Sequence, residues 1–127
     1  MPVKYLSPEW IDAYNAAMAE DDAVHKALKG KSAVIQMVVT DAPDEIHYAL
    51  RIGDGTASVS LGDAADAEVT IRQSYETSAL VNKGELDGAK AFTQGKVKIS
   101  GKMMKMMQLQ RPLAEVQKAL NAIDTEY

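Results

Sequence analysis

The residues that could perform acid–base chemistry in this chain gather around His47. Glu45, His47 and Arg51 alternate along one predicted strand, so their side chains would lie on the same face of a sheet. Tyr48 follows His47 directly, and an imidazole beside a carboxylate or a phenol could exchange protons with a substrate. No nucleophile stands at motif spacing from His47, and His25 has still less context. An exposed surface histidine is therefore the favoured interpretation, and we expect no enzymatic activity.

Other patterns that suggest ligand sites have simpler explanations. The carboxylates Asp41, Asp44 and Glu45 surround Pro43, where a solvated turn explains them better than a calcium site. The glycines of residues 53–55 belong to a predicted hairpin turn rather than a phosphate loop, because no helix follows them. Cysteine is absent, which excludes disulfides, thiolate nucleophiles and Cys-ligated metal sites. We expect neither a metal ion nor a cofactor.

The stretch from residue 84 to residue 110 suits binding better than catalysis. It combines apolar side chains of adaptable shape with positive charge, and it contains no His or Cys. Seven of the 14 basic residues lie between Lys83 and Arg111, against two of the 18 acidic ones. A site for an amphipathic molecule with an acidic head would need such a mixture.

Length and charge limit the class of protein. A chain of 127 residues has the size of one domain with one core, so we expect residues 1–127 to form a single domain. The net charge of -4 argues against nucleic acid as a partner. No apolar run is long enough to cross a bilayer, and the N-terminus lacks the apolar stretch of a signal peptide. We expect a soluble, cytoplasmic protein.

Apolar periodicity and turn residues predict an alternation of helices and strands. Capping residues predict helices that begin after Ser7, Asp21 or Asp22, Ser74 and Asp87. Alternation predicts five strands, at residues 33–40, 45–52, 57–61, 68–73 and 96–100. Tight turns between the first four strands predict antiparallel pairing. The order of elements favours an α+β fold, in which a mostly antiparallel sheet has helices massed on one face.

The C-terminal part of the chain is predicted to be helical and contains Pro112. Because proline suits the first turn of a helix better than its interior, we predict a Met-rich helix before Pro112 and a separate amphipathic helix from it onward. The methionines of residues 103–107 would cover more than one face of the first helix, which is more than packing on a sheet requires. The surplus apolar surface needs a ligand, a partner chain or the C-terminal helix to cover it.

Several motifs in the second half of the chain form an ordered series. They are residues 67–71 leading to Gly84-Glu85-Leu86, then residues 91–101 with the sequence AFTQGKVKISG, and finally Met107-Gln108-Leu109-Gln110. This series resembles the sterol carrier protein 2 family, the sterol-transfer domain. The resemblance implies a five-stranded sheet covered by helices that enclose an apolar tunnel for fatty acids, acyl-CoA, sterols or other lipids. It implies no chemistry on the ligand.

The resemblance also implies which residues bind the lipid. The tunnel would be walled and covered by apolar residues of the predicted helices, namely Leu80, Val81, Phe92, Met103, Met104, Met106, Met107, Leu109, Leu113, Val116 and Leu120. An acidic head group or an anionic membrane surface would be attracted by Lys96, Lys98, Lys102 and Lys105. Relatives carry small residues at the positions of Met104 and Met106, so the size of the ligand stays open.

Alternative interpretations remain for both groups of residues. The lysines could form an ordinary solvated face or protect a strand edge from aggregation. The methionines could fill the tunnel, and the apolar surface would then serve oligomerisation, as in a homodimer, or contact an enzyme as an accessory subunit. Transient contact with a membrane is also compatible with this composition. An enzyme that uses His47 with Glu45 or Tyr48 ranks last.

Overall fold

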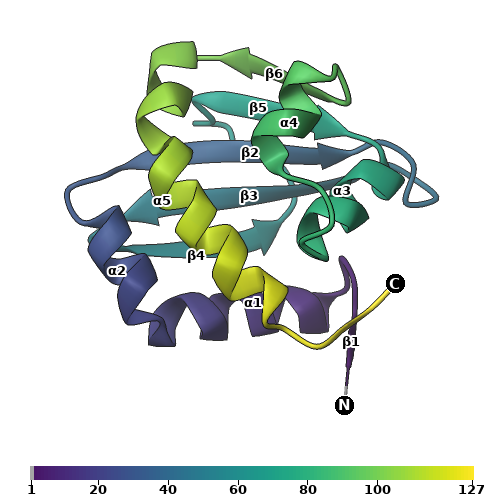
Figure 1. The fold of residues 1–127 in the computed structure, drawn as a ribbon, viewed down its shortest axis with the longest axis horizontal. Coiled ribbons are helices and arrows are strands. Elements are labelled where there is room, and N and C mark those ends of the chain that lie inside the picture. Colours follow the sequence, from purple (N-terminus) through teal and green to yellow (C-terminus); the bar gives the residue numbers. More distant parts are fainter. Residues whose placement is uncertain (1) are drawn as a thin grey trace.

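The computed structural model describes residues 2–127 and combines a five-stranded sheet with five helices and a short pair of terminal strands (Figure 1). The helices are α1 (Pro8–Glu20), α2 (Asp22–Leu28), α3 (Tyr75–Asn82), α4 (Gly88–Thr93) and α5 (Met103–Asn121). The strands of the sheet are β2 (Ala33–Val39), β3 (Ile46–Gly53), β4 (Thr56–Leu61), β5 (Val69–Gln73) and β6 (Val97–Gly101). The predicted α+β class and the five predicted strands are confirmed.

Four helices begin where their capping residues predict. The side chains of Ser7, Asp21, Ser74 and Asp87 each accept a hydrogen bond from a backbone N–H of the first helical turn. These bonds satisfy donors that a helix leaves unpaired at its start, and each contributes about 1 kcal/mol. The remaining described helix, α5, begins without a side-chain cap. Its start therefore depends on the contacts of the strand that precedes it.

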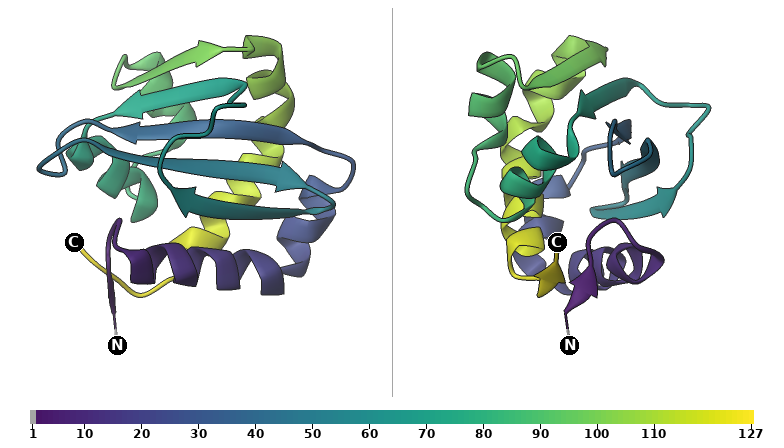
Figure 2. Two further views of the ribbon diagram at one scale, coloured as in Figure 1. Left: turned by 180° about the vertical axis from the view of Figure 1, so that it is seen from behind. Right: turned by 90° about the vertical axis from the view of Figure 1, so that its right-hand side faces the viewer.

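The strand order is β4-β3-β2-β5-β6, and three of the four pairings are antiparallel. The central β2–β5 pairing is parallel, with Ile35 opposite Val69. The prediction of antiparallel pairing among the first four strands is therefore wrong at this point. The segment between β4 and β5 is no tight turn, because it carries the chain past β3 and β2 across the face of the sheet that has no helices (Figure 2).

Gln36 holds this crossover, residues 62–68, against the sheet. Its side chain is buried in β2, where its amide donates to the Gly62 carbonyl at 3.2 Å and accepts from the Ala64 N–H at 2.7 Å. The same amide nitrogen lies 3.2 Å from the Tyr48 carbonyl. An unpaired buried amide would cost about 1–3 kcal/mol, so each bond to the crossover matters. A single polar residue in an apolar strand thus fixes the path between β4 and β5.

His47 ties the same crossover to β3. Its Nδ1 contacts Oδ1 of Asp63, and its Nε2 lies 2.6 Å from Oε1 of Glu45. Arg72 on β5 lies 3.3 Å from the other carboxylate oxygen of Glu45. The hydrogen bonds to Glu45 and then to Asp63 raise the pKa of His47 above its ordinary value, because both carboxylates stabilise the charged ring. The open face of the sheet therefore carries a row of alternating charges.

The helices lie on the other face of the sheet or along its β4 edge (Figure 2). α1 follows β4, and the Asn15 side chain donates to the Val59 carbonyl at 3.0 Å and accepts from the Val59 N–H at 2.7 Å. This pairing occupies a strand edge that could otherwise bind another strand. The largest fully buried side chains of the core between these layers are Trp10, Met18, Leu28, Ile35, Leu109, Val24, Val39 and Val69.

α5 runs through Pro112 without a break, so the prediction of two separate helices is wrong. Proline removes one N–H and leaves the carbonyl of Gln108 without its helical partner, at a cost of about 3 kcal/mol. Leu109 before the proline and Val116 after it are both buried in the same core. Burial of such side chains stabilises by about 1.5–3 kcal/mol each, which offsets the cost of a continuous helix.

Two short terminal strands, β1 (Val3–Lys4) and β7 (Thr125–Glu126), pair in parallel and were not predicted. Tyr5 follows β1, and its ring lies 5.0 Å from those of Trp10 and Tyr127. The pairing thus places the C-terminal segment against an aromatic cluster that includes Trp10 of α1. Strands of two residues give almost no periodicity, so a sequence pattern cannot reveal them.

β6 passes into α5 at Gly101, where two backbone segments approach closely. A Cβ atom at this position would overlap the carbonyl oxygen of Glu68 and lie 3.0 Å from Cα of Val69. The φ angle of 106° also disfavours any residue with a side chain. Lys102 then donates its N–H to the Glu68 carbonyl at 2.9 Å. The start of α5 therefore requires glycine at this position.

We expect Gly101→Ala to destabilise the protein far more than Gly95→Ala. Gly95 also has positive φ, 76°, but open space surrounds its Cα, so alanine there should cost only about 1–2 kcal/mol of backbone strain. Gly101→Ala adds overlap with backbone atoms and should cost about 3 kcal/mol or more in total. Urea unfolding followed by the fluorescence of Trp10 measures both values. Equal losses in the two variants would contradict the close approach.

We expect His47→Gln to remove a stabilising contribution that depends on pH. Because the folded pKa of His47 is raised, its charged ring stabilises the fold fully below the unfolded value of about 6.5, and this stabilisation is lost as pH rises through the folded pKa. Wild type and variant should differ most in unfolding free energy near about pH 5.5, where the carboxylates remain ionised. Urea titrations across this range check the result. A difference that stays constant into alkaline pH would mean that the charge of His47 is unimportant.

Candidate functional site

α5 distributes the predicted lipid-binding residues over two faces. Leu109, Val116 and Leu120 are buried in the main core, and Met106 and Leu113 are half-buried against it. These residues follow the spacing of one helical face. They form the side of α5 that is turned toward the sheet.

Met103, Met104 and Met107 lie on the outer side of the same helix. Their side chains are 42%, 70% and 66% exposed. Because an α-helix has about 3.6 residues per turn, positions 103 and 107 share a face that points away from Leu109 and Val116. The structure thus separates these three methionines from the sheet-facing residues. Phe92, on α4, is exposed as well.

Two neighbouring rows of side chains cross the helix-covered face of the sheet, and they differ in burial. The first row runs through Val59, Leu50, Ile35 and Val69, which stand opposite one another on β4, β3, β2 and β5. All four are buried, with at most 5% of any side chain exposed. The helices above this row exclude solvent from it.

The second row is covered less completely on β2, β5 and β6. Met37, Ile71 and Ile99 stand opposite one another on these strands, and all three are only half-buried. Met106 and Leu113 of α5 are half-buried in the same way, and all five residues pack against the main core. We call Met37, Ile71, Ile99, Met106 and Leu113 the apolar band.

α3 borders α5 on the same side of the sheet (Figure 1). Nε2 of Gln117 on α5 donates to the Val81 carbonyl of α3 at 3.1 Å. Leu80 and Val81, both predicted to bind lipid, are half-buried on α3. The structure therefore brings the two helices together and leaves part of their apolar surface open.

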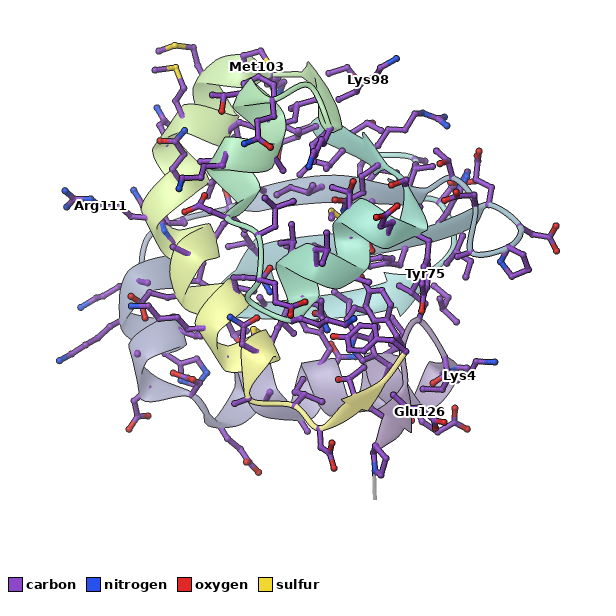
Figure 3. All side chains as sticks on the ribbon, turned by 45° about the vertical axis from the view of Figure 1, so that its right-hand side comes forward. Lys4, Tyr75, Lys98, Met103, Arg111 and Glu126 are labelled. Atoms are coloured by element: carbon purple, nitrogen blue, oxygen red, sulfur yellow. The ribbon has the colours of Figure 1, made fainter. Side chains whose placement is uncertain are left out.

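The four lysines predicted to bind a head group do not gather at one place, and Lys96 lies exposed in the turn between α4 and β6. Lys105 donates to the Ser32 carbonyl at 2.8 Å and lies 3.2 Å from Oε2 of Glu68, which Lys102 also approaches at 3.5 Å. The hydrogen bond from Lys105 lowers the pKa of Glu68 below its ordinary value. Lys98 stands opposite Arg72 and projects from the open face of the sheet (Figure 3).

Two shallow hollows lie on the surface beside α5. One has a volume of about 670 Å³ and lies between Lys31, which follows α2, and residues 107–115 of α5. The other has a volume of about 420 Å³ and is lined by residues of the segment 102–108. Gln108 borders both. The apolar tunnel that the resemblance implies is not shown by the structure over residues 2–127.

The sheet separates His47 from Tyr48. His47 lies beside Glu45 on the open face, whereas Tyr48 is buried on the helix side, where desolvation raises the pKa of its phenol. Within residues 2–127, no group of three or more His, Cys, Asp or Glu side chains is arranged to hold a metal ion. None of the helices in that range is long and apolar enough to span a membrane.

Sequence reasoning did not select Met37, Ile71 and Ile99 as site residues. Strand alternation places Ile71 and Ile99 on the core side of their strands. Their position opposite Met37 depends on the β2–β5 register, which joins segments far apart in the chain. No local pattern could have revealed that register.

Comparison with solved structures identifies the same fold in sterol carrier proteins. A crystal structure of sterol carrier protein 2 has 19% sequence identity and a TM-score of 0.81, over 94% of this chain and 99% of that protein. A conserved hypothetical protein of Thermus thermophilus, described as a sterol carrier protein candidate, has 19% identity and a TM-score of 0.81, over 98% and 92% of the two chains. At such identities the similarity shows the fold alone.

The same fold also occurs within an enzyme chain. The stereoselective inverting sec-alkylsulfatase Pisa1 of Pseudomonas sp. has 22% identity and a TM-score of 0.64, over 96% of this chain but only 17% of its own. No curated protein sequence matches this chain.

A family model gives the assignment that the structures alone do not. The model of the SCP-2 sterol transfer family matches residues 12–114, which include the whole sheet and the first two thirds of α5. The protein therefore belongs to the SCP-2 sterol transfer family.

Proposed function

We propose that this protein binds a lipid, without chemical change, along the apolar band and the adjoining part of α3. The observation that carries the proposal is the difference between two neighbouring rows of the sheet. Ile35 and Val69 are fully buried, whereas Met37, Ile71 and Ile99 are only half-buried, although all five lie on the same face of the sheet. A ligand with an apolar body would complete the cover of the second row.

The residues of the band suit a fatty acid, acyl-CoA or sterol-like molecule. Each methylene buried against them would contribute about 0.8 kcal/mol, so an acyl chain gives useful affinity without directional contacts. Met37 and Met106 have flexible side chains that can move aside for a ligand. Of the predicted head-group residues, Lys102 has a side chain that is 68% exposed and lies 3.5 Å from Glu68, so it can turn toward a head group.

Mass spectrometry of the intact protein under native conditions, with extraction of co-purified lipids, tests the proposal directly. A fluorescent fatty acid then gives the dissociation constant, and unlabelled lipids compete for the same site. We expect saturable binding that long acyl chains displace. A purified protein with no bound lipid and no saturable displacement would contradict lipid binding.

We expect Met106→Gln to weaken fatty-acid binding about tenfold, because it replaces an apolar side chain of the band with a polar one of similar length. Met104→Gln is the matched control. Met104 is 70% exposed on the outer face of α5, so this variant should bind as wild type does. Unfolding curves monitored by Trp10 fluorescence confirm that both variants fold. Equal effects of the two substitutions would show that the ligand does not occupy the band.

A further inference from the structure

The outer face of α5 carries apolar side chains that neither the core nor the apolar band uses. Met103 and Met107 are one turn apart, and Arg111 continues the same line one turn later. Met104 lies beside them and is 70% exposed. A helix that packs on a sheet needs an apolar stripe on one side only. These methionines leave a second stripe open to solvent.

Positive charge surrounds this stripe. Arg111 and Lys31 line the larger hollow together with Met107, and Lys102 lines the smaller one together with Met103 and Met104. Among the ion pairs of the described residues, none includes Arg111 or Lys31.

Two acidic residues border this surface, and each is paired with lysine: Glu68 lies 3.5 Å from Lys102 and 3.2 Å from Lys105. Glu115 is the acidic residue that lines the larger hollow, and it lies 3.2 Å from Lys118. The protein as a whole has a net charge of -4, so this basic surface is a local reversal of its charge.

We propose that this outer face, formed by Met103, Met104, Met107, Arg111, Lys31 and Lys102, docks the protein on the surface of an anionic lipid bilayer. Flexible apolar side chains beside cations match the two components of that surface, acyl chains and negatively charged head groups. Figure 3 shows Met103 at the start of α5 and Arg111 projecting outward from the helix, away from the sheet.

A second copy of the chain fits this face less well. A two-fold symmetric contact would place the same patch of each copy against the other. Arg111 and Lys31 of one protomer would then approach those of its partner, and like charges would repel one another. An anionic bilayer offers the opposite charge, so the pattern of charges favours the membrane.

The position of α5 connects docking with the ligand site, although neither proposal requires the other. The outer face and the band residues of α5, Met106 and Leu113, lie on different sides of one helix, whose diameter with side chains is about 10–12 Å. A protein docked through α5 would hold the band within that distance of the bilayer surface. A lipid would then travel only a short path between the bilayer and the band.

Flotation of the intact protein with phosphatidylcholine vesicles, with and without phosphatidylserine, tests the docking surface. We expect binding that requires phosphatidylserine and weakens as salt is added. The double variant Met104→Gln with Met107→Gln should bind about tenfold more weakly. Arg111→Glu should also weaken binding, by about fivefold or more.

Two matched controls separate a defined surface from general properties of the protein. Lys98→Glu changes the net charge as Arg111→Glu does, but on the open face of the sheet. Leu61→Gln removes an apolar side chain that is 47% exposed at the β4 edge. Both controls should bind vesicles as wild type does. Losses equal to those of the α5 variants would overturn the proposal.

Four further outcomes are decisive. Absence of vesicle binding by wild type overturns the proposal, as does a dimer in light scattering that the double methionine variant dissociates. Fatty-acid titration of that double variant distinguishes the two sites. If the double variant keeps its affinity for fatty acid but no longer floats with the vesicles, the two surfaces are separate. If it loses both fatty-acid binding and vesicle binding, the assignment of the outer face to docking alone is overturned.

Discussion

The junction of β6 with α5 determines where the two proposed binding surfaces lie. Gly101 lets the backbone of β6 approach Glu68 and Val69 so closely that no side chain fits between them. Glu68 joins β2 to α5. Its Oε1 accepts a hydrogen bond from the Val34 N–H of β2 at 3.2 Å, and its Oε2 lies 3.2 Å from Lys105 of α5. Since α5 has no side-chain cap of its own, these contacts fix its first turn and so the direction in which each later residue points.

A helix held in this way can present two different apolar faces. Leu109, Val116 and Leu120 anchor α5 in the core on both sides of Pro112, so the helix does not rotate to bury its outer methionines. The same anchoring leaves Met106 and Leu113 half-buried at the margin of the core. A single long helix therefore supplies both a wall of the proposed ligand site and the proposed docking surface, which two short independent helices could not keep in register.

The sequence predicts those features of the fold that contacts between neighbouring residues determine. The caps at Ser7, Asp21, Ser74 and Asp87 and the alternation within each strand depend on neighbouring residues, and all are found in the structure. The parallel β2–β5 pairing depends instead on a crossover that Gln36 holds from another strand. Continuity through Pro112 depends on burial at both ends of the helix. For the same reason, composition could suggest the methionines as a binding surface but could not show which of them face the sheet.

A closely packed aromatic cluster borders the apolar band at β3, where Tyr48 stands opposite Met37. Trp10 packs edge to face against Tyr5, Tyr14 and Tyr48, with ring centroids 5.0, 5.3 and 5.6 Å apart, and aromatic pairs of this kind contribute about 0.5–1.5 kcal/mol each beyond their burial. This cluster joins α1 to β3, on the side of the sheet away from β5 and β6. Because this part of the core is closely packed, Met37, Ile71 and Ile99 can stay partly uncovered without loss of the fold. A site that admits and releases a lipid needs partly uncovered residues beside a closely packed core. A band packed as tightly as Ile35 and Val69 would leave no apolar surface for a ligand to bury.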